Sequence, residues 1–481
     1  MRWRWVMIVA AGAAVAWCGP LAAGGTADAV LAGAAGSWRH AIEVPGLGTL
    51  NAGGEAGVRS VSCGSAGNCA AGGFYTGSVS GQAFVAVERN GRWGKAARLP
   101  GLAALNAGGD AQVSGVSCPS AGNCAAGGFY ADAKFHLQAF VASERSGRWD
   151  RAVEVPGSAA LNAGRSAQVS SVSCASAGNC AAGGFYRDGS RHFQAFVVTE
   201  RNGRWRRAVE VPGSGVLNAG GRAEVSSVSC PSAGNCAAGG FYSDGSGHNQ
   251  AFVAVERDGR WRRAVEVPGL GALNPGGFAR GLSVSCGSAG NCAAGGFYSE
   301  SEVNVQAFVV SERNGRWGKA IQVPGSGGLN VGGDAESLSV SCASAGSCAA
   351  GGFYTDGSPA SQAFVVSERN GLWGKAVEVP GSGALNAGGD AEVSSVSCAS
   401  AGNCAAGGFY TDGSLDIQAF VASERNGRWG GAIEVPGSGA LNAGGDGGVN
   451  SVSCPSAGNC AAGGLYVDGS GHIQGFVVSQ T

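Results

Sequence analysis

The chain has 481 residues, and 89 of them are glycine, more than twice the share of about 7% in ordinary proteins. Its 32 Lys and Arg nearly balance its 33 Asp and Glu, and a formal charge of −1 excludes binding to nucleic acid through bulk charge. Hydrophobic residues at 44%, with 11 Trp and 18 Phe, exclude a disordered chain.

The N-terminus has the layout of a secretory signal peptide. Arg2 and Arg4 precede an apolar run over residues 6–17, which is short for a membrane span. Small residues follow, and Ala27-Asp28-Ala29 offers a small-x-small cleavage site. We therefore predict a signal peptide over residues 1–29 and a mature chain that is secreted or held at the cell surface, with no transmembrane domain.

Three alternatives at the N-terminus stay open. Cleavage after Leu21-Ala22-Ala23 is the second choice of site. Cys18 would be the attachment point of a lipid in a lipoprotein, although bulky Trp17 before it is unlike the usual small residue. An uncleaved anchor is the third alternative. Residues 30–37 are predicted to be a short linker.

The cysteines predict a disulfide framework. Of the 17 cysteines, all except Cys18 fall into eight Cys-x5-Cys pairs, and such a pattern outside the cell indicates disulfides. The spacing is longer than zinc ligands usually have, and no histidine recurs beside each pair, so we predict no metal site and no cofactor. The pairs are Cys63/Cys69, Cys118/Cys124, Cys174/Cys180, Cys230/Cys236, Cys286/Cys292, Cys342/Cys348, Cys398/Cys404 and Cys454/Cys460.

The cysteine pairs recur every 55 or 56 residues, so the chain consists of eight repeats. In the seventh unit, four β-rich runs span residues 391–398, 404–410, 418–425 and 428–436, and we call such runs strands A to D. Asn426-Gly427 between C and D is a strong hairpin signal, and the cysteine pair requires A and B to be neighbours.

Four-stranded meanders repeated eight times predict an all-β fold, an eight-bladed β-propeller of antiparallel blades over residues 38–481. The hairpins exclude a parallel β-helix, and a string of eight small domains is the remaining alternative. The last unit ends after strand C, whereas residues 38–45 form a strand without a partner. We predict that residues 38–44 pair with 474–480, which closes the ring and makes a monomer sufficient.

The abundance of glycine follows from this architecture. Gly407-Gly408, Ala405-Ala406 and Ser394-Ser395 fall on strands A and B. Blades converge there on the axis, and large side chains would not fit between them.

Ser-Val-Ser-Cys-x-Ser-Ala-Gly-Asn-Cys and Arg-Asn-Gly-x-Trp occur in nearly every unit and resemble repeats of secreted bacterial proteins, common in actinobacteria. The resemblance covers residues 38–481 and implies an exported, propeller-like protein without a defined activity. Ser423 to Trp429 also looks like the Asp-box turn of sialidase-type propellers. Asn426 replaces the Asp, and the spacing is shorter, so sialidase chemistry is not implied.

The loops from B to C and from D to the next A are predicted to share one face, which is the default ligand surface. The units that depart most from the consensus carry their differences there. Neutral variation in solvated loops is the competing interpretation. The candidate ligand-binding residues are Arg165, Arg222, Phe278, Arg280, His192 and His248.

Two arginines flank each turn from C to D on the opposite face, except where Leu372 replaces one. Opposed like charges repel, and we expect the neighbouring glutamate, such as Glu88 or Glu424, and water to offset the repulsion. The alternative is an anionic partner, a cell-wall polymer or sulfated glycan. This candidate anion-binding rim comprises Arg89, Arg92, Arg145, Arg148, Arg201, Arg204, Arg257, Arg260, Arg313, Arg316, Arg425 and Arg428.

These patterns favour a rigid exported scaffold that binds a carbohydrate, a cell-wall polymer or another protein. The first alternative is a glycan hydrolase or lyase with its site at the channel mouth, because propellers also carry active sites. The second is a structural surface protein without a specific ligand. No catalytic residue is singled out.

Overall fold

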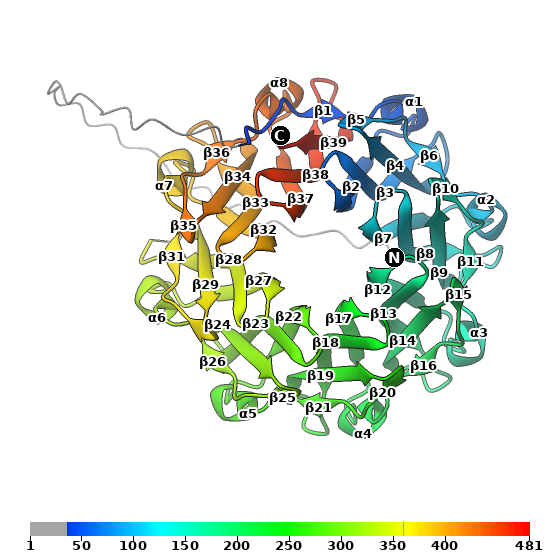
Figure 1. The fold of residues 1–481 in the computed structure, drawn as a ribbon, viewed down its shortest axis with the longest axis horizontal. Coiled ribbons are helices and arrows are strands. Elements are labelled where there is room, and N and C mark those ends of the chain that lie inside the picture. The colour runs from blue at the N-terminus through cyan, green and yellow to red at the C-terminus, as the bar shows by residue number, and fades with distance from the viewer. Residues whose placement is uncertain (1–35, 359) are drawn as a thin grey trace, which may run out of the picture. The chain divides into compact units, whose positions relative to one another are not determined.

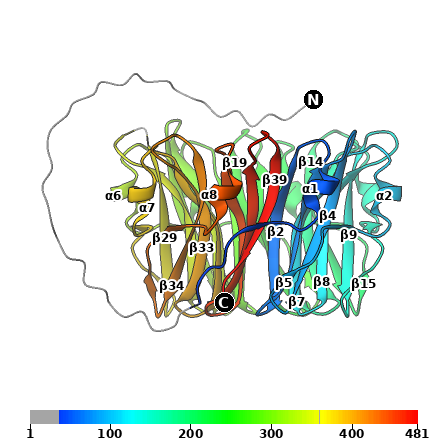
Figure 2. The ribbon, with the colours of Figure 1, turned by 90° about the horizontal axis from the view of Figure 1, so that it is seen from above.

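In the computed structural model, which describes residues 36–481 apart from residue 359, the chain forms eight antiparallel blades around an axis. This is the predicted β-propeller (Figure 1). Strand A of each blade is innermost and strand D lies at the rim, and Figure 2 shows the strands running between the two faces of the ring. The predicted signal peptide over 1–29 and most of the linker lie outside the described residues.

Strands A and B form the inner half of each blade. Their registers contain a bulge in strand A of every blade, for example between Val169 and Ser171. Strands A are β2 (Ala56–Ser65), β7 (Ala111–Ser120), β12 (Ala167–Ser176), β17 (Ala223–Ser232), β22 (Arg280–Ser288), β27 (Ala335–Ser344), β32 (Ala391–Ser400) and β37 (Gly447–Ser456). Strands B are β3 (Asn68–Thr76), β8 (Asn123–Ala131), β13 (Asn179–Arg187), β18 (Asn235–Ser243), β23 (Asn291–Ser301), β28 (Ser347–Thr355), β33 (Asn403–Thr411) and β38 (Asn459–Val467).

Strand C is continuous, whereas strand D is interrupted and consists of two short segments that both pair with C. Strands C are β4 (Gly81–Arg89), β9 (Leu137–Arg145), β14 (Phe193–Arg201), β19 (Asn249–Arg257), β24 (Asn304–Arg313), β29 (Ser361–Arg369), β34 (Ile417–Arg425) and β39 (Ile473–Ser479). The D segments are β5 (Arg92–Trp93), β6 (Ala97–Arg98), β10 (Arg148–Trp149), β11 (Val153–Glu154), β15 (Arg204–Trp205), β16 (Val209–Glu210), β20 (Arg260–Trp261), β21 (Val265–Glu266), β25 (Arg316–Trp317), β26 (Ile321–Gln322), β30 (Leu372–Trp373), β31 (Val377–Glu378), β35 (Arg428–Trp429), β36 (Ile433–Glu434) and, in blade eight, β1 (Ile42–Glu43).

Each connection from D to the next A contains a four-residue helix where the sequence predicts a loop. The helix follows a glycine in the left-handed region, such as Gly157 with φ 80°, which a residue with a side chain adopts only under strain. Arg207 of the next blade also packs against this glycine. The helices are α1 (Leu47–Leu50), α2 (Leu102–Leu105), α3 (Ser158–Leu161), α4 (Ser214–Leu217), α5 (Leu270–Leu273), α6 (Ser326–Leu329), α7 (Ser382–Leu385) and α8 (Ser438–Leu441).

Strands from the two ends of the propeller complete blade eight, as predicted. Ile42 pairs with Val477 and Glu43 with Phe476, and Trp38 forms a further bridge to Gln480. The Val44 N–H donates to the Gly475 carbonyl at 2.9 Å. The ring is therefore closed within one chain, because β1 pairs with the outer edge of β39, the strand C of blade eight.

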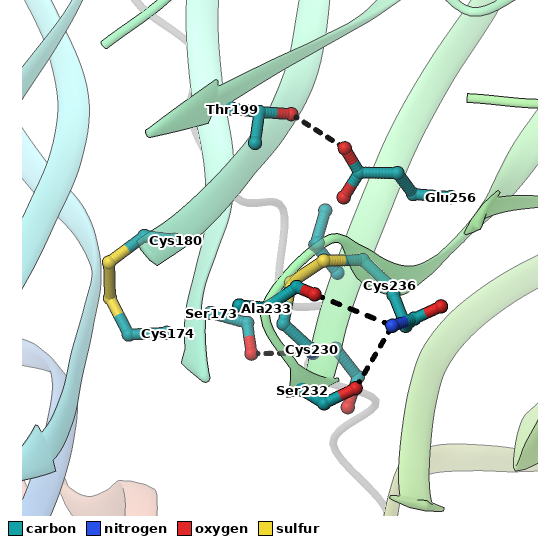
Figure 3. Close-up of a disulfide and its surroundings, with 12 residues drawn as sticks. Ser173, Cys174, Cys180, Thr199, Cys230, Ser232, Ala233, Cys236 and Glu256 are labelled. Carbon is teal, nitrogen blue, oxygen red and sulfur yellow. Dashed lines mark hydrogen bonds between the residues drawn. A yellow bond between two sulfur atoms is a disulfide. The ribbon is translucent and has the colours of Figure 1, made fainter. Parts of the chain in front are cut away.

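The eight predicted disulfides are all present. Each joins strands A and B of one blade across directly neighbouring positions, with Cα atoms 3.9 to 4.1 Å apart. Figure 3 shows two of them, Cys174–Cys180 and Cys230–Cys236, in adjacent blades. Closing so short a loop stabilises the fold by about 2 kcal/mol at most in the chain-entropy model, so each bond staples a hairpin.

The disulfide cysteines are core residues and not residues of a surface site. The second cysteine of each pair is the second residue of strand B, is 4 to 6% exposed, and packs into the hydrophobic core of its blade. Because burial keeps ligands and reductants away from these side chains, their role is structural. The buried second cysteines are Cys69, Cys124, Cys180, Cys236, Cys292, Cys348, Cys404 and Cys460.

The Ser-Val-Ser-Cys motif joins neighbouring blades. Strand A has an unpaired edge, and its backbone N–H groups need acceptors. The Ser173 hydroxyl accepts from the Cys230 N–H at 2.9 Å, and Ser171 accepts from the Val228 N–H at 3.0 Å (Figure 3 shows the first). The same two bonds recur between the other blades except at Gly115 of blade two, so the motif supplies hydrogen bonds between innermost strands.

The paired glycines of strand B have two separate causes. A Cβ on Gly407 would lie 2.7 Å from a Val449 methyl of the next blade, which confirms the predicted crowding between blades. A Cβ on Gly408 would instead collide with the Glu392 carbonyl of its own blade. Gly408 pairs with Val393, next to the bulge between Val393 and Ser395 in strand A.

One inner-ring bond is missing. Gly115 stands where the other blades have serine, and the Val172 N–H has no hydroxyl acceptor there. We predict that Gly115→Ser raises the free energy of unfolding above that of Gly115→Ala by about 0.5–1.5 kcal/mol, because only serine adds the bond. Denaturant unfolding of both variants measures this, and equal stability would contradict it.

Candidate functional site

The predicted neighbourhood of the B–C loops and the D–A connections is confirmed. The Phe193 N–H at the start of strand C donates to the Gly221 carbonyl of the next connection at 2.9 Å. The His192 imidazole packs against Gly221, 2.6 Å from where a Cβ would lie. We call the end of the ring axis surrounded by these loops and connections the axial mouth.

Side-chain amides fix the backbone around the axial mouth. Asn218 Nδ2 donates to the Phe193 carbonyl and to Gln194 Oε1, both at 2.9 Å, and so ties a D–A connection to the preceding blade. Asp188 in turn accepts from Gln194 and from the His192 N–H. Slight burial raises the pKa of Asp188, but these hydrogen bonds outweigh it and hold the pKa below its ordinary value. The aspartate is therefore ionised and holds the B–C loop.

Three predicted ligand-binding residues meet in one cluster at the axial mouth. Arg280 lies over the ring of Phe241, 4.3 Å from its centroid, and 5.1 Å from the centroid of Phe278. Arg222 lies 5.5 Å from the same Phe241 ring, and Phe278 packs on Phe297 at 5.3 Å. The side chain of Phe278 is 40% exposed, so an aromatic and a cationic surface face solvent together.

The charges around Arg280 are incompletely compensated. Burial lowers the pKa of Arg280, as does the positive charge of Arg222, while Glu224 and Glu336 act in the opposite direction. Arg222 pairs with Glu224 at 3.4 Å. Arg280 Nε, in contrast, is buried and has no hydrogen-bond partner among the described residues. This buried donor is therefore left unsatisfied by the described residues.

Glu336 on the next blade has a strongly perturbed carboxyl group. Burial raises its pKa to about 8, and the charges of Asp334 and Glu392 add to this effect, whereas Arg280 opposes it. Burial likewise raises the pKa of Glu392. Glu336 is thus largely protonated at neutral pH and can donate a proton or a hydrogen bond.

Glu224 and Glu336 were not predicted from the sequence, because glutamate also stands at their strand-A position in blade seven, so they do not break the repeat as Arg280 does. A comparison of the second strand-A position across the units would have found them, since this position differs from blade to blade. Its residues are Gly57, Gln112, Gln168, Glu224, Arg280, Glu336, Glu392 and Gly448. Leu282 and Leu338 replace serine two residues later in blades five and six. The residues that differ between blades are therefore found on the innermost strands as well as in the loops.

Of the other candidate ligand-binding residues, His192 and His248 lie beside this cluster, and Arg165 lies on another connection. His192 packs on the residue before Arg222, and His248 packs on Gly277, the residue before Phe278. Arg165 lies on the connection to blade three, in the left-handed region at φ 68°, where other units have glycine. Among residues 36–481 without 359, no group of three or more metal-ligating side chains gathers, and no helix is long and apolar enough to span a membrane.

The arginine rim divides into two classes, and the expected role of the neighbouring glutamate was wrong. Arg201 pairs at 2.8 Å with Glu256 of the following blade, not with the adjacent Glu200. Neighbouring residues of a strand point to opposite faces, so Glu200 instead accepts from Ser143 of the preceding blade. The first arginines with such pairs are Arg89, Arg145, Arg201, Arg257, Arg313 and Arg369.

The other first arginine of the rim, Arg425, donates to the Gly36 carbonyl at the open end of blade eight. The second arginine of each pair begins strand D and is exposed. These are Arg92, Arg148, Arg204, Arg260, Arg316 and Arg428. The first class therefore holds blades together, and the second class is available to a partner.

No family model matches the chain, and no curated protein matches it. Among solved structures, Sqt1 from Chaetomium thermophilum bound to the N-terminus of the ribosomal protein L10 is 12% identical, covers 88% of this chain and 96% of its own, and has a TM-score of 0.51. Sqt1 from the same organism in another structure is 13% identical, covers 89% and 97%, and has a TM-score of 0.50. An ulvan lyase is 10% identical, covers 80% and 95%, and has a TM-score of 0.41. The similarity to the two Sqt1 structures shows the propeller fold alone.

Substitution of Glu336 tests its perturbed carboxyl. The unfolded chain loses this proton near the ordinary pKa of 4.5, whereas the folded chain keeps it until about 8, so folding loses stability as pH rises between these values. We predict that Glu336→Gln, the residue type of blades two and three, becomes increasingly stable relative to the parent from about pH 5 to about pH 8. Urea unfolding across this range measures the difference, and a constant difference would contradict it.

Proposed function

We propose that the chain is an exported, disulfide-stapled scaffold that binds a carbohydrate, cell-wall polymer or protein ligand at the axial mouth. The observation that carries this proposal is the cluster of Arg222, Phe278 and Arg280, where two adjacent blades, four and five, break the eightfold pattern together. The exposed ring of Phe278 and the cationic guanidinium of Arg280 beside it form a surface that a ligand can contact.

Export is supported by the eight disulfides, which persist in oxidising surroundings. The proposed location is therefore outside the cell or on its surface, in an actinobacterial-type organism as the repeat resemblance implies. The closed ring makes a monomer sufficient. The proposal requires no cofactor and no nucleic acid.

The side chains of the cluster favour a carbohydrate among the proposed ligands. A sugar ring presents an apolar face to Phe278, and its hydroxyl or carboxylate groups suit Arg280 and Glu336. A protein ligand is the other choice, since Sqt1, whose fold is similar, is bound to the N-terminus of a ribosomal protein. Either ligand would use the pre-formed, hydrogen-bonded loops around the mouth.

A glycan and peptide array with the mature protein tests the site. The double variant Phe278→Ser and Arg280→Gln uses residues that blade three carries at the same positions, Ser166 and Gln168, so the blade tolerates them. We expect this variant to lose binding about tenfold or more, while the matched control Asp446→Ser in blade eight keeps it. Absence of any ligand on the array, or a ligand held equally by the double variant, would contradict the proposal.

Glycan hydrolysis or elimination is a second candidate function, favoured by the protonated Glu336 beside Glu392. A carboxylic acid with a pKa near 8 and a second carboxyl form the kind of pair that acts as acid and base on a glycosidic bond. Incubation with the glycans that bind, followed by assay of new reducing ends or unsaturated products, separates an enzyme from a binding scaffold. If the parent protein forms such products and both Glu336→Gln and Glu392→Gln lose them, the protein is an enzyme. If the parent forms no such products, binding alone is favoured.

A further inference from the structure

Exposed arginines concentrate on strand D of two adjacent blades. Three positions around the strand-D tryptophan are all arginine in blades three and four. In blades five to seven the same positions hold at most two basic residues, and glycine stands at the middle one, as in Gly318, Gly374 and Gly430. We call the six arginines of blades three and four the basic arc: Arg204, Arg206, Arg207, Arg260, Arg262 and Arg263.

The charges of the basic arc are not neutralised by the protein. Across residues 36–481 other than 359, none of the six guanidinium groups lies within ion-pair distance of a carboxylate. The glutamates of the same D strands are engaged elsewhere, since Glu210 and Glu266 accept from the hydroxyls of Tyr186 and Tyr242 at 2.9 and 3.0 Å. In blade two, by contrast, Asp150 stands at the middle position and pairs with Arg145 at 3.3 Å.

A groove of about 460 Å³ runs beside the arc between blades three and four. The interruption of strand D opens it over strand C at Val197 and Val198, whose side chains are buried, and the exposed side chain of Val209 gives the groove an apolar wall. Trp261 of blade four lies on one side, and Arg206 and Arg207 of blade three lie on the other. The groove therefore combines an apolar, aromatic surface with unpaired guanidinium groups.

We propose that the basic arc and this groove bind an anionic polysaccharide at the rim of the ring. Sugar rings would lie against Trp261 and Val209, and sulfate, carboxylate or phosphate groups would bond to the arginines. The arc shares Arg204 and Arg260 with the predicted anion-binding rim but occupies one side of the ring. This site lies on outer strands and does not rest on the axial-mouth proposal.

The groove favours a polysaccharide over nucleic acid. Single-stranded nucleic acids bind where several aromatic side chains are open for base stacking, and here one half-buried tryptophan serves the groove. The near-neutral charge of the whole chain also provides no general polyanion surface. Binding therefore depends on the arc and its groove together.

Removal of the arc charges tests the inference on the full mature chain. In the arc variant, Arg204 and Arg260 become Ser and Arg206 and Arg262 become Gly. Blade eight has Ser37 at the first position and blades five to seven have glycine at the second, so the blade accommodates both. The control variant also loses four positive charges, on other blades and outside the anion-binding rim, through Lys95→Gly, Arg151→Gly, Lys319→Gly and Lys375→Gly, since blade seven has Gly431 at this position.

The probes are dextran sulfate, uncharged dextran and a single-stranded oligonucleotide of matched charge, with Kd measured by titration calorimetry. We expect the parent and the control to bind dextran sulfate alike, and the arc variant to bind it about tenfold or more weakly. Equal loss in arc and control variants, absence of binding by the parent, or equally tight binding of the oligonucleotide would overturn the proposal. Weakening by the Phe278→Ser and Arg280→Gln variant would instead move the site to the axial mouth.

Discussion

The structure depends on hydrogen bonds that each blade makes to the next. An innermost strand leaves backbone N–H groups unpaired at the axis, and two serines of the preceding blade accept from them, as Ser173 does from Cys230. Near the rim, Glu200 is 1% exposed and bonds to Ser143 of the preceding blade, whose hydroxyl also accepts from the Trp205 indole N–H at 3.0 Å. Burial raises the pKa of Glu200, and the Ser143 hydroxyl and the charge of Arg145 oppose that rise. A buried carboxylate so held is costly to leave unpaired, and this cost ties neighbouring blades together.

Most repeated positions take part in these contacts between blades, so residues that serve a function are expected at the positions that vary. Two contacts between neighbouring blades lack one of the hydrogen bonds, and we call them weak joints. Val87 and Val255 stand where the other blades have a hydroxyl, and the indole N–H groups of Trp149 and Trp317 in the following blades are buried without a hydrogen-bond partner in the described part of the chain. The second of these joints lies between blades four and five. The axial-mouth cluster spans the same two blades, and the basic arc includes one of them.

The period, the cysteine pairs and the unmatched strand at residues 38–45 were enough to predict blade number, disulfides and closure, because each is a constraint along the chain itself. Contacts between blades were harder to predict. The sequence places Arg201 next to Glu200, yet the alternation of side chains sends them to opposite neighbours and pairs Arg201 with Glu256. Arg222 and Phe278 were found as breaks in the D–A connections, and Arg280 as a break at the start of strand A. Glu336 was not found, because glutamate also stands at its position in blades four and seven and therefore does not depart from the repeat.

Closure of the ring by the two chain ends is the claim on which the arrangement of both faces depends. Hydrogen exchange of the amides in residues 36–45, followed by mass spectrometry or NMR, measures it directly. The Val44 N–H bonds to Gly475 as the Val211 N–H of an internal blade bonds to Ala195, each at 2.9 Å. We predict comparable protection for these two amides. Exchange of the 36–45 amides at the rate of an unprotected chain, with Val211 still protected, would contradict the account.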